Sequence, residues 1–319
     1  MNPEKIRIIF MGTPDFAVGV LDTLVQRNFQ IVAVVTAVDK PAGRGKKLKA
    51  SSVKKYAIEH AIPVLQPKNL KHPDFLHQLA SYKADLQIIV AFRMLPESVW
   101  NMPQYGTINL HASLLPAYRG AAPINWAIIN GETETGVTTF FIDDKIDTGA
   151  ILLQDKIAIT PDETAGTLHD KLMDIGSRLV VRTIELIATE SYKTQKQPDK
   201  APSLAPKIYK DTCRIDWKQS VTTIYNKIRG LSPYPVAWTY LQIDSDVFPI
   251  KIYKARKECI APKHKIGDIV STKKTMKVAC TDGYIYLEEV QLSGKRRMDI
   301  VSFLNGFKLS DTAQMVEEK

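Results

Sequence analysis

The sequence is poor in cysteine and has no long apolar run. Its three cysteines, Cys213, Cys259 and Cys280, lie far apart and form no CxxC pair. A disulfide framework is therefore not indicated, and the sequence offers no zinc or other metal site. No apolar segment is long enough for a signal peptide or a membrane span, and the first residues lead directly into a predicted strand. We therefore expect reduced thiols and a cytoplasmic protein that does not bind membranes.

Glycine is scarce where a dinucleotide-binding protein needs it. The strand predicted for residues 6–11 is followed by a turn with one glycine, Gly12, before a helix predicted for residues 15–28. The dinucleotide fingerprint requires three glycines in such a turn. We therefore expect neither NAD nor FAD as a ligand.

Strand and helix patterns alternate through the first half of the chain. Strands are predicted at residues 6–11, 30–36 and 85–91, and helices at residues 15–28, 54–60, 70–82 and 164–189. This order predicts an α/β fold with an open, mostly parallel Rossmann-like sheet and helices on both faces. Ligands of such sheets bind beyond the carboxyl ends of the strands.

The composition changes after residue 191. The following segment carries Lys, Gln, Ser and three prolines but few large apolar residues, which is typical of a linker. We therefore predict a catalytic domain at 1–191, a linker at 192–208 and a second domain at 209–319; a long loop inside one domain is the alternative.

The predicted second domain is more basic than the first. Of the net charge of +9, a net +7 lies after residue 200, which has 20 of the 43 basic and 13 of the 34 acidic residues. Short β-branched and aromatic segments at 249–253, 277–280 and 284–290 alternate with glycine turns, which predicts a small β-barrel. An oligonucleotide-binding (OB-like) barrel would fit the surplus charge.

The stretch from Thr107 to Ile151 carries most of the chemistry. Asn109 and His111 alternate with apolar residues, so a strand would place both polar side chains on one face. A shaped loop of Pro, Gly and small residues follows, and we expect it to line a pocket through Ser113, Leu114, Leu115 and Pro116. A β-branched strand then leads into an acidic turn with Asp143, Asp144 and Asp147.

An amide, an imidazole and a carboxylate are the groups that acyl transfer to an amine requires. The amide of Asn109 can bind a developing oxyanion, His111 can move protons, and Asp147 can orient the imidazole. Each residue also has a purely structural interpretation. Asn109 could end a strand, His111 could be a hydrogen-bonded core residue, and Asp147 could form an Asx turn before Gly149.

Residues 38–49 combine two glycines, a proline and a cluster of basic side chains that includes Arg44, Lys46 and Lys47. A charge run is usually a solvated surface loop, but this one follows a predicted strand beside the predicted pocket. We therefore favour a clamp for a polyanion. The Lys295–Arg297 run is interpreted as a solvated turn, with a phosphate contact as the alternative.

Several of these motifs together resemble the signature of the folate-dependent formyltransferases. They are Asn109-Leu110-His111, Ser113-Leu114-Leu115-Pro116, Arg119-Gly120 and Asp147-Thr148-Gly149. Met11 to Phe16, the basic loop and Ala121 to Ile124 resemble one branch of that superfamily. The resemblance covers essentially the whole chain and is strongest up to Leu153.

The resemblance implies transfer of a formyl group from 10-formyltetrahydrofolate to the α-amino group of methionyl initiator tRNA, without a metal. It assigns oxyanion binding to Asn109 with His111, proton transfer to His111, and tuning of His111 and ordering of the folate site to Asp147. The family binds the pterin through two loops, which correspond here to Phe92, Arg93, Met94 and Leu95 and to the turn with Asp143 and Asp144. Arg44, Lys46, Lys47 and Lys207 would contact the tRNA.

Two other functions remain open from the sequence. The same chemistry could act on a small amine, such as an amino-sugar nucleotide or glycinamide ribonucleotide, although the basic loop would then have no purpose. A non-catalytic RNA-binding protein on the same scaffold would not need Asn109, His111 and Asp147 together. Nothing in the sequence requires a dimer, so we expect a monomer.

Overall fold

The computed structural model describes residues 2–42, 47–310 and 312–317, without the side chains of residues 42 and 47. By Cα packing the chain forms two compact units. The first unit contains the chain up to Gly120, Glu134–Ile157 and His169–Ala205. The second contains Ala121–Thr133, Ala158–Leu168 and the chain from Pro206 onward. Each unit is described separately.

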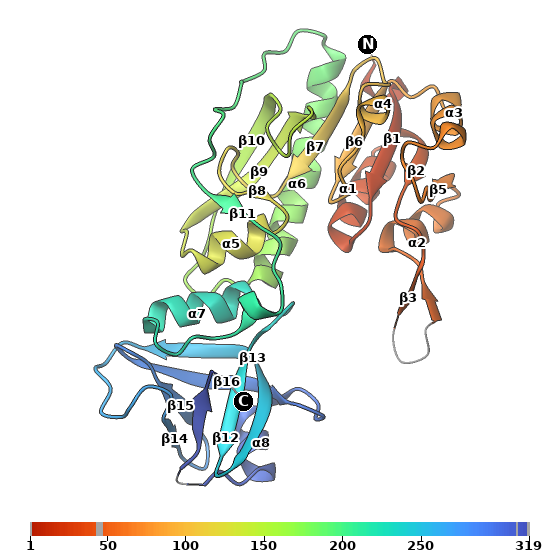
Figure 1. The fold of residues 1–319 in the computed structure, drawn as a ribbon. Coiled ribbons are helices and arrows are strands. Elements are labelled where there is room, and N and C mark those ends of the chain that lie inside the picture. Colours follow the sequence, from red (N-terminus) through yellow and green to blue (C-terminus); the bar gives the residue numbers. More distant parts are fainter. Residues whose placement is uncertain (1, 43–46, 311, 318–319) are drawn as a thin grey trace. The chain divides into compact units, whose positions relative to one another are not determined.

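The first unit is built on a seven-stranded sheet of order β10-β9-β7-β6-β1-β2-β5 (Figure 1). The strands are β1 (Arg7–Gly12), β2 (Gln30–Val35), β5 (Val64–Leu65), β6 (Leu86–Val90), β7 (Thr107–His111), β9 (Glu134–Phe141) and β10 (Ile151–Ala158). Strands β5, β2, β1, β6 and β7 pair in parallel, whereas β9 runs antiparallel to β7.

Helices cover both faces of this sheet. They are α1 (Asp15–Gln26), α2 (Ser52–Glu59), α3 (Pro73–Ser81), α4 (Glu97–Trp100) and α6 (Ala165–Ala188). Ile9 and Met11 of β1 lie in one buried cluster with side chains of α3 and α4. On the opposite face, Gly176 of α6 lies against Leu110 of β7. The predicted open, mostly parallel sheet with helices on both faces is confirmed.

The helix bounds follow local chemistry. The predicted helix at 164–189 is α6, whose apolar residues Leu168, Leu172, Leu179 and Ile184 are buried. The helix predicted for 54–60 begins earlier, at Ser52, because the Ser51 hydroxyl accepts a hydrogen bond from the Lys54 amide and caps it.

The second unit contains an antiparallel sheet of order β14-β15-β16-β13-β12-β18, with β17 paired to β16. Its elements are β12 (Ala237–Ile243), β13 (Asp246–Glu258), β14 (Ile269–Ser271), β15 (Met276–Ala279), β16 (Tyr284–Leu292), β17 (Met298–Asp299), β18 (Gln314–Val316) and α8 (Ile300–Gly306). Gln314 also pairs with Asp268, just before β14, which nearly closes the sheet. The predicted small barrel is therefore confirmed.

Two segments from earlier in the chain complete the second unit. They are α5 (Pro123–Ile129) and residues 158–168, which pack with α7 (Val221–Gly230). The Asn125 amide donates to the Gly230 carbonyl at 2.7 Å. The Tyr225 hydroxyl donates to Asp162 at 2.6 Å, and the buried Arg229 guanidinium donates to the Glu163 carbonyl at 3.0 Å.

The segment predicted as a linker is ordered by strand pairing within the first unit. Gln195 pairs with Ile151, and β11 (Leu204–Ala205) runs parallel to β8 (Arg119–Gly120). The predicted domain boundaries, at 191 and 209, stay a prediction, because the compact units are assembled from non-contiguous segments.

The basic loop is bounded by two short antiparallel strands, β3 (Lys40–Ala42) and β4 (Lys47–Lys49). The sequence indicated only a loop there. Strands of three residues show too little periodicity to be recognised.

Two of the cysteines are buried singly. Burial raises the pKa of the Cys280 thiol to about 12 and also raises that of Cys213, so both are protonated thiols at neutral pH. Cys259 is exposed. Among the described residues, no helix is long and apolar enough to cross a membrane. In the same part of the chain, no group of three or more His, Cys, Asp or Glu side chains could hold a metal ion.

Candidate functional site

Strand β7 carries Asn109 and His111 on the same face of the first unit's sheet. Asn109 lies opposite Ile89 of β6, and Ile89 belongs to the cluster packed under α3 and α4. Paired residues of parallel strands point to the same side, so the two polar side chains face away from α6. His111 is buried and is the last residue of the strand.

Both ring nitrogens of His111 have a defined neighbour. Nε2 lies 2.8 Å from the main-chain carbonyl oxygen of Tyr118. A carbonyl can only accept, so Nε2 carries a proton and donates it. Nδ1 faces the Asp147 carboxylate at 3.8 Å, which is longer than a hydrogen bond but within range of an ion pair. Nδ1 is therefore the atom through which this imidazole can exchange a proton.

Asp147 reaches His111 from a loop that folds back over the sheet. The loop leaves β9 near the start of β7, where the Ile142 amide donates to the Thr107 carbonyl. Asp147 has φ +55°, in the left-handed region. Its Oδ2 accepts a hydrogen bond of 2.9 Å from the Gly120 amide, which holds the carboxylate beside His111.

The side chain of Asn109 is half-buried and makes no hydrogen bond with any other described residue. Neither its amide nitrogen nor its amide oxygen is among the buried polar atoms that lack a partner, so both remain accessible. Asn109 therefore offers a donor on the face that carries His111, where a ligand oxygen can accept it.

The loop that carries Asp147 closes too tightly for a side chain at Gly149. A Cβ there would lie 1.7 Å from the main-chain oxygen of Phe141, which cannot move without breaking its strand. We expect Gly149→Ala to lower the free energy of unfolding by about 1–3 kcal/mol, the usual cost of overpacking. Chemical denaturation measures this loss. Gly306→Ala is the control, since nothing lies within 4 Å of that position, and an equal loss in both variants would contradict the steric argument.

The predicted pterin loop after β6 contains Phe92, Arg93, Met94 and Leu95. Leu95 is buried and Phe92 packs on the same cluster, whereas Met94 is 65% exposed. The Arg93 guanidinium donates to the main-chain oxygens of Pro67 and Lys68, and partial burial lowers its pKa. These contacts anchor the loop and leave the Met94 side chain exposed.

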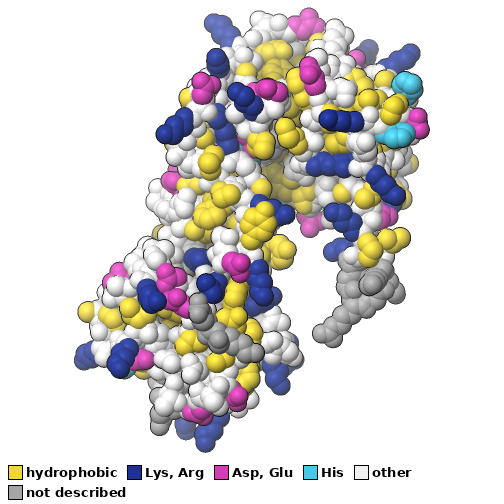
Figure 2. Space-filling model, viewed as in Figure 1, with side chains coloured by type: hydrophobic (Ala, Val, Ile, Leu, Met, Phe, Trp, Pro, Cys, Tyr) yellow, Lys and Arg dark blue, Asp and Glu magenta, His cyan; other side chains and the backbone are white. Residues whose placement is uncertain are grey.

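The second predicted pterin loop is the acidic turn. Asp143 accepts hydrogen bonds from the Thr148 hydroxyl and the Lys145 amide, so its carboxylate shapes the turn. Asp144 is exposed, and Ile146 is 63% exposed. Ile142, at the start of this turn, packs on the same hydrophobic cluster as Phe92, so both predicted pterin loops are supported by that cluster. Figure 2 shows a hollow in the first unit with hydrophobic side chains at its base.

The loop after His111 divides into buried and accessible residues. Ser113 is fully buried and its hydroxyl donates to the Ala117 carbonyl, while the Leu115 amide donates to the Thr138 hydroxyl. Leu114 and Pro116 are half-buried. Ser113 and Leu115 thus hold the loop's shape.

The predicted tRNA contacts are only partly visible. Arg44 and Lys46 lie outside the described residues, and Lys47 is described in its backbone alone. Lys207 belongs to the second unit, is exposed and lies over the Tyr209 ring, with its Nζ 5.5 Å from the ring centroid.

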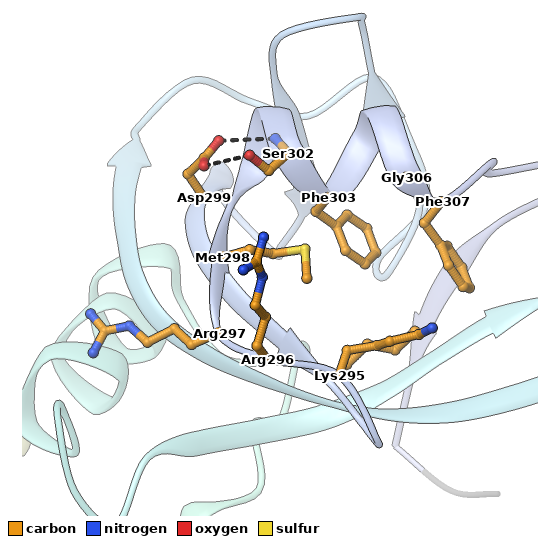
Figure 3. A pocket seen from close by; sticks show the side chains of 10 residues that line it. Lys295, Arg296, Arg297, Met298, Asp299, Ser302, Phe303, Gly306 and Phe307 are labelled. Carbon is orange, nitrogen blue, oxygen red and sulfur yellow. Dashed lines mark hydrogen bonds between the residues drawn. The ribbon is translucent and has the colours of Figure 1, made fainter.

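The Lys295–Arg297 turn borders a cavity of about 460 Å³ in the second unit (Figure 3). Its walls also include Met298 and Phe307. Arg297 is paired with Glu289, whereas the side chains of Lys295 and Arg296 form no ion pair with another described residue. In Figure 2, basic side chains are spread over the visible face of this unit with acidic ones between them.

Sequence reasoning missed the groups that hold the His111–Asp147 pair. The carbonyl of Tyr118 and the amide of Gly120 are main-chain groups, which leave no side-chain signal. Gln197, which binds the Asp147 loop, lies in the segment interpreted as a linker. Gln197 is buried, with 5% of its surface exposed. Burial would have indicated a structural role, but it cannot be recognised in a polar stretch of sequence.

The family follows from sequence comparison. Residues 4–184 match the family described as formyl transferase, and residues 207–308 match the formyl transferase C-terminal domain. The chain therefore belongs to the formyl transferase family.

Its relatives narrow the class further. A methionyl-tRNA formyltransferase of Flavobacterium johnsoniae is 55% identical over 98% of this chain and 99% of its own length. One from Bacteroides thetaiotaomicron is 50% identical over 99% of this chain and its full length. Within the family, the chain groups with the methionyl-tRNA formyltransferases.

Solved structures share the fold at low sequence identity. HypX of Aquifex aeolicus, in complex with tetrahydrofolic acid, superposes with a TM-score of 0.64 at 19% identity, over 94% of this chain and 47% of that one. WlaRD, a sugar 3N-formyl transferase, gives 0.65 at 21% identity, over 91% and 99%. At this identity the likeness concerns the fold alone.

Proposed function

We propose that the protein transfers a formyl group from 10-formyltetrahydrofolate to the α-amino group of methionyl initiator tRNA, for translation initiation. The observation that carries this proposal is the arrangement at the end of β7. There, Nδ1 of His111 faces Asp147 while the Asn109 amide, on the same face, has no described partner. The methionyl-tRNA formyltransferases, which match over nearly the full length, support the choice of acceptor.

The chemistry needs no nucleophilic side chain, because the acceptor provides an amine. A bond forms between the methionine nitrogen and the formyl carbon, and the bond from that carbon to the folate nitrogen breaks. The Asn109 amide stabilises the negative charge on the formyl oxygen, and the His111 imidazole contributes once its Nδ1 is protonated. Nδ1 of His111 accepts the proton that the amine loses and returns it to the departing folate nitrogen.

Asp147 supports His111 in this scheme. With Nε2–H bound to Tyr118, a proton on Nδ1 makes the ring a cation, and the carboxylate 3.8 Å away stabilises that cation. The hydrogen bond from the Gly120 amide keeps the carboxylate in place as the charge appears and disappears. The same loop orders the folate site.

The residues present fit a folate. A pterin is a flat ring with polar edges, so it requires apolar walls and main-chain hydrogen bonds. The two loops packed on one cluster expose Met94 and Ile146, and the turn at Asp143 and Asp144 offers main-chain groups. We assign pterin binding to these loops and to Leu114 and Pro116.

A single-turnover assay with the formyl donor and methionyl-tRNA tests the proposal. We expect formyl-methionyl-tRNA to form and uncharged tRNA to compete. Transfer to an amino-sugar nucleotide without competition by tRNA would support the small-amine alternative. Binding of tRNA without any transfer would support the RNA-binding alternative.

Arg44 is assigned a phosphate contact of the tRNA, with Lys46, Lys47 and Lys207 in support. We expect Arg44→Ala to weaken tRNA binding and to lower the slope of log affinity against log salt by about 1, because one fewer counterion is released. Filter binding over a series of salt concentrations measures both. Arg27→Ala, at another exposed arginine of the first unit, should leave the slope unchanged. An unchanged slope in Arg44→Ala would remove the assignment.

We also propose that the enzyme acts as a monomer in the cytoplasm, where initiator tRNA is charged. Asn109, His111 and Asp147 all come from the first unit of one chain. Sedimentation equilibrium at assay concentration tests the monomer.

A further inference from the structure

The loop that carries Asp147 is held by a distant part of the chain. Residues 195–205 lie along it and along residues 118–120. Gln195 pairs with Ile151, directly after the loop, and the Tyr118 amide donates to the Ser203 carbonyl at 2.9 Å. Strand β11 then pairs with β8. One segment therefore contacts the Asp147 loop and also the residues whose main chain binds His111 and Asp147.

Gln197 makes the most direct of these contacts. Its buried Nε2 donates to the main-chain oxygen of Asp147 at 3.1 Å and to that of Gly149 at 2.7 Å. Its Oε1 accepts from the Arg119 guanidinium at 2.9 and 3.2 Å. Carbonyls only accept and a guanidinium only donates, so the amide has one possible orientation. No other uncharged side chain of this length offers both functions.

Arg119 fixes Gln197 in turn. It is buried, and it also donates to the main-chain oxygens of Pro198 at 2.8 Å and Asp199 at 3.2 Å. The next residue, Gly120, donates its amide to the Asp147 carboxylate. Arg119 and Gly120 thus hold Asp147 from two directions, one through Gln197 and one directly.

We propose that Gln197, oriented by Arg119, is a positioning residue for Asp147. Its two hydrogen bonds keep Asp147 in the left-handed conformation, with φ +55°, that directs the carboxylate at Nδ1 of His111. This inference rests on the catalytic role proposed for Asp147. Gln197, which lies in the segment predicted as a linker, would then be one of the residues on which the rate of formyl transfer depends.

Gln197→Glu tests the donor without changing the volume. It keeps an acceptor for Arg119 but turns an oxygen toward two carbonyl oxygens. We expect kcat to fall about ten- to a hundred-fold, since a misplacement of about 1 Å can cost on the order of a hundred-fold, with an unchanged KM for tRNA. The uncharged Gln197→Met should lose a similar factor. Gln87→Met is the control. Gln87 is also a buried glutamine, but it lies beside the first residue of β7, at the end of the strand away from His111, and its Nε2 already lacks a partner.

A double-mutant cycle with Asp147→Asn separates positioning from general stability. If Gln197 acts through Asp147, Gln197→Met costs less than threefold in kcat once Asp147 is already Asn. An equal factor in both backgrounds, after correction for the folded fraction by circular dichroism, would show a merely structural role. Near-normal kcat in Gln197→Met with an inactive Asp147→Asn would overturn this inference alone. Near-normal kcat in Asp147→Asn would contradict the catalytic role proposed for Asp147 and with it this inference, whereas absence of transfer by the unmodified enzyme would overturn the proposed function.

Discussion

Replacing His111 by alanine is expected to lower kcat by about a hundred- to ten-thousand-fold, the usual contribution of a positioned acid–base group. The variant loses the nitrogen that faces Asp147 and therefore the only proton acceptor that the scheme provides for the attacking amine. Single-turnover transfer to methionyl-tRNA measures the effect.

The same replacement also removes the buried hydrogen bond from His111 to the Tyr118 carbonyl, a bond that contributes about 0.5–1.5 kcal/mol to stability. Unfolding by circular dichroism shows whether the lost activity is lost chemistry or lost fold. His169→Ala is the matched control, because His169 also contacts an aspartate, Asp170, but at the surface of the first unit. Normal turnover in a folded His111→Ala enzyme would remove His111 from the mechanism.

Asp147→Asn is expected to have a comparably large effect, up to about ten-thousand-fold in kcat, as for the carboxylate that supports the catalytic histidine of a serine protease. The new side chain has nearly the same shape, and its oxygen can still accept from the Gly120 amide. Only the charge that stabilises a protonated His111 is lost. Asparagine also tolerates the positive φ of this position, so the loop should keep its conformation.

Asp170→Asn is the control for charge, because its carboxylate is exposed and, among the described residues, pairs only with His169. The loss in Asp147→Asn should appear in kcat, with an intact fold by circular dichroism. A change confined to KM for the folate would instead assign Asp147 to ligand binding and leave His111 to act without it.

The regular elements of the first unit were accessible from sequence because long periodic patterns determine them. The helix predicted for 164–189 spans Ala165–Ala188, and Asn109 and His111 share a face of β7 as the alternation requires. The short pairs β3–β4 and β8–β11 were not predicted, since two or three residues form no recognisable period.

The candidate site could be predicted only in part, because its side chains are visible in the sequence and the contacts that position them are not. Side-chain chemistry indicated Asn109, His111 and Asp147, and the family resemblance gave them roles. The path of the Asp147 loop could not be predicted, because β9 runs antiparallel to β7 and the carboxylate returns to His111 only through contacts with Gly120 and Gln197. Such contacts depend on three-dimensional proximity between residues 27 to 50 positions apart.

The composite second unit limits how this chain can be recombined. The family boundary at residue 207 looks like a natural place to join halves from two relatives. A chimaera joined there would pair one parent's α7 with the other parent's α5 and residues 158–168. The Tyr225 hydroxyl donates to the Asp162 carboxylate and the Arg229 guanidinium to the main-chain oxygen of Glu163. In the chimaera, each donor would have to bind the residue that the other parent has at position 162 or 163. The segments before and after residue 207 therefore do not evolve independently, because a substitution in one changes the packing of the other within the second unit.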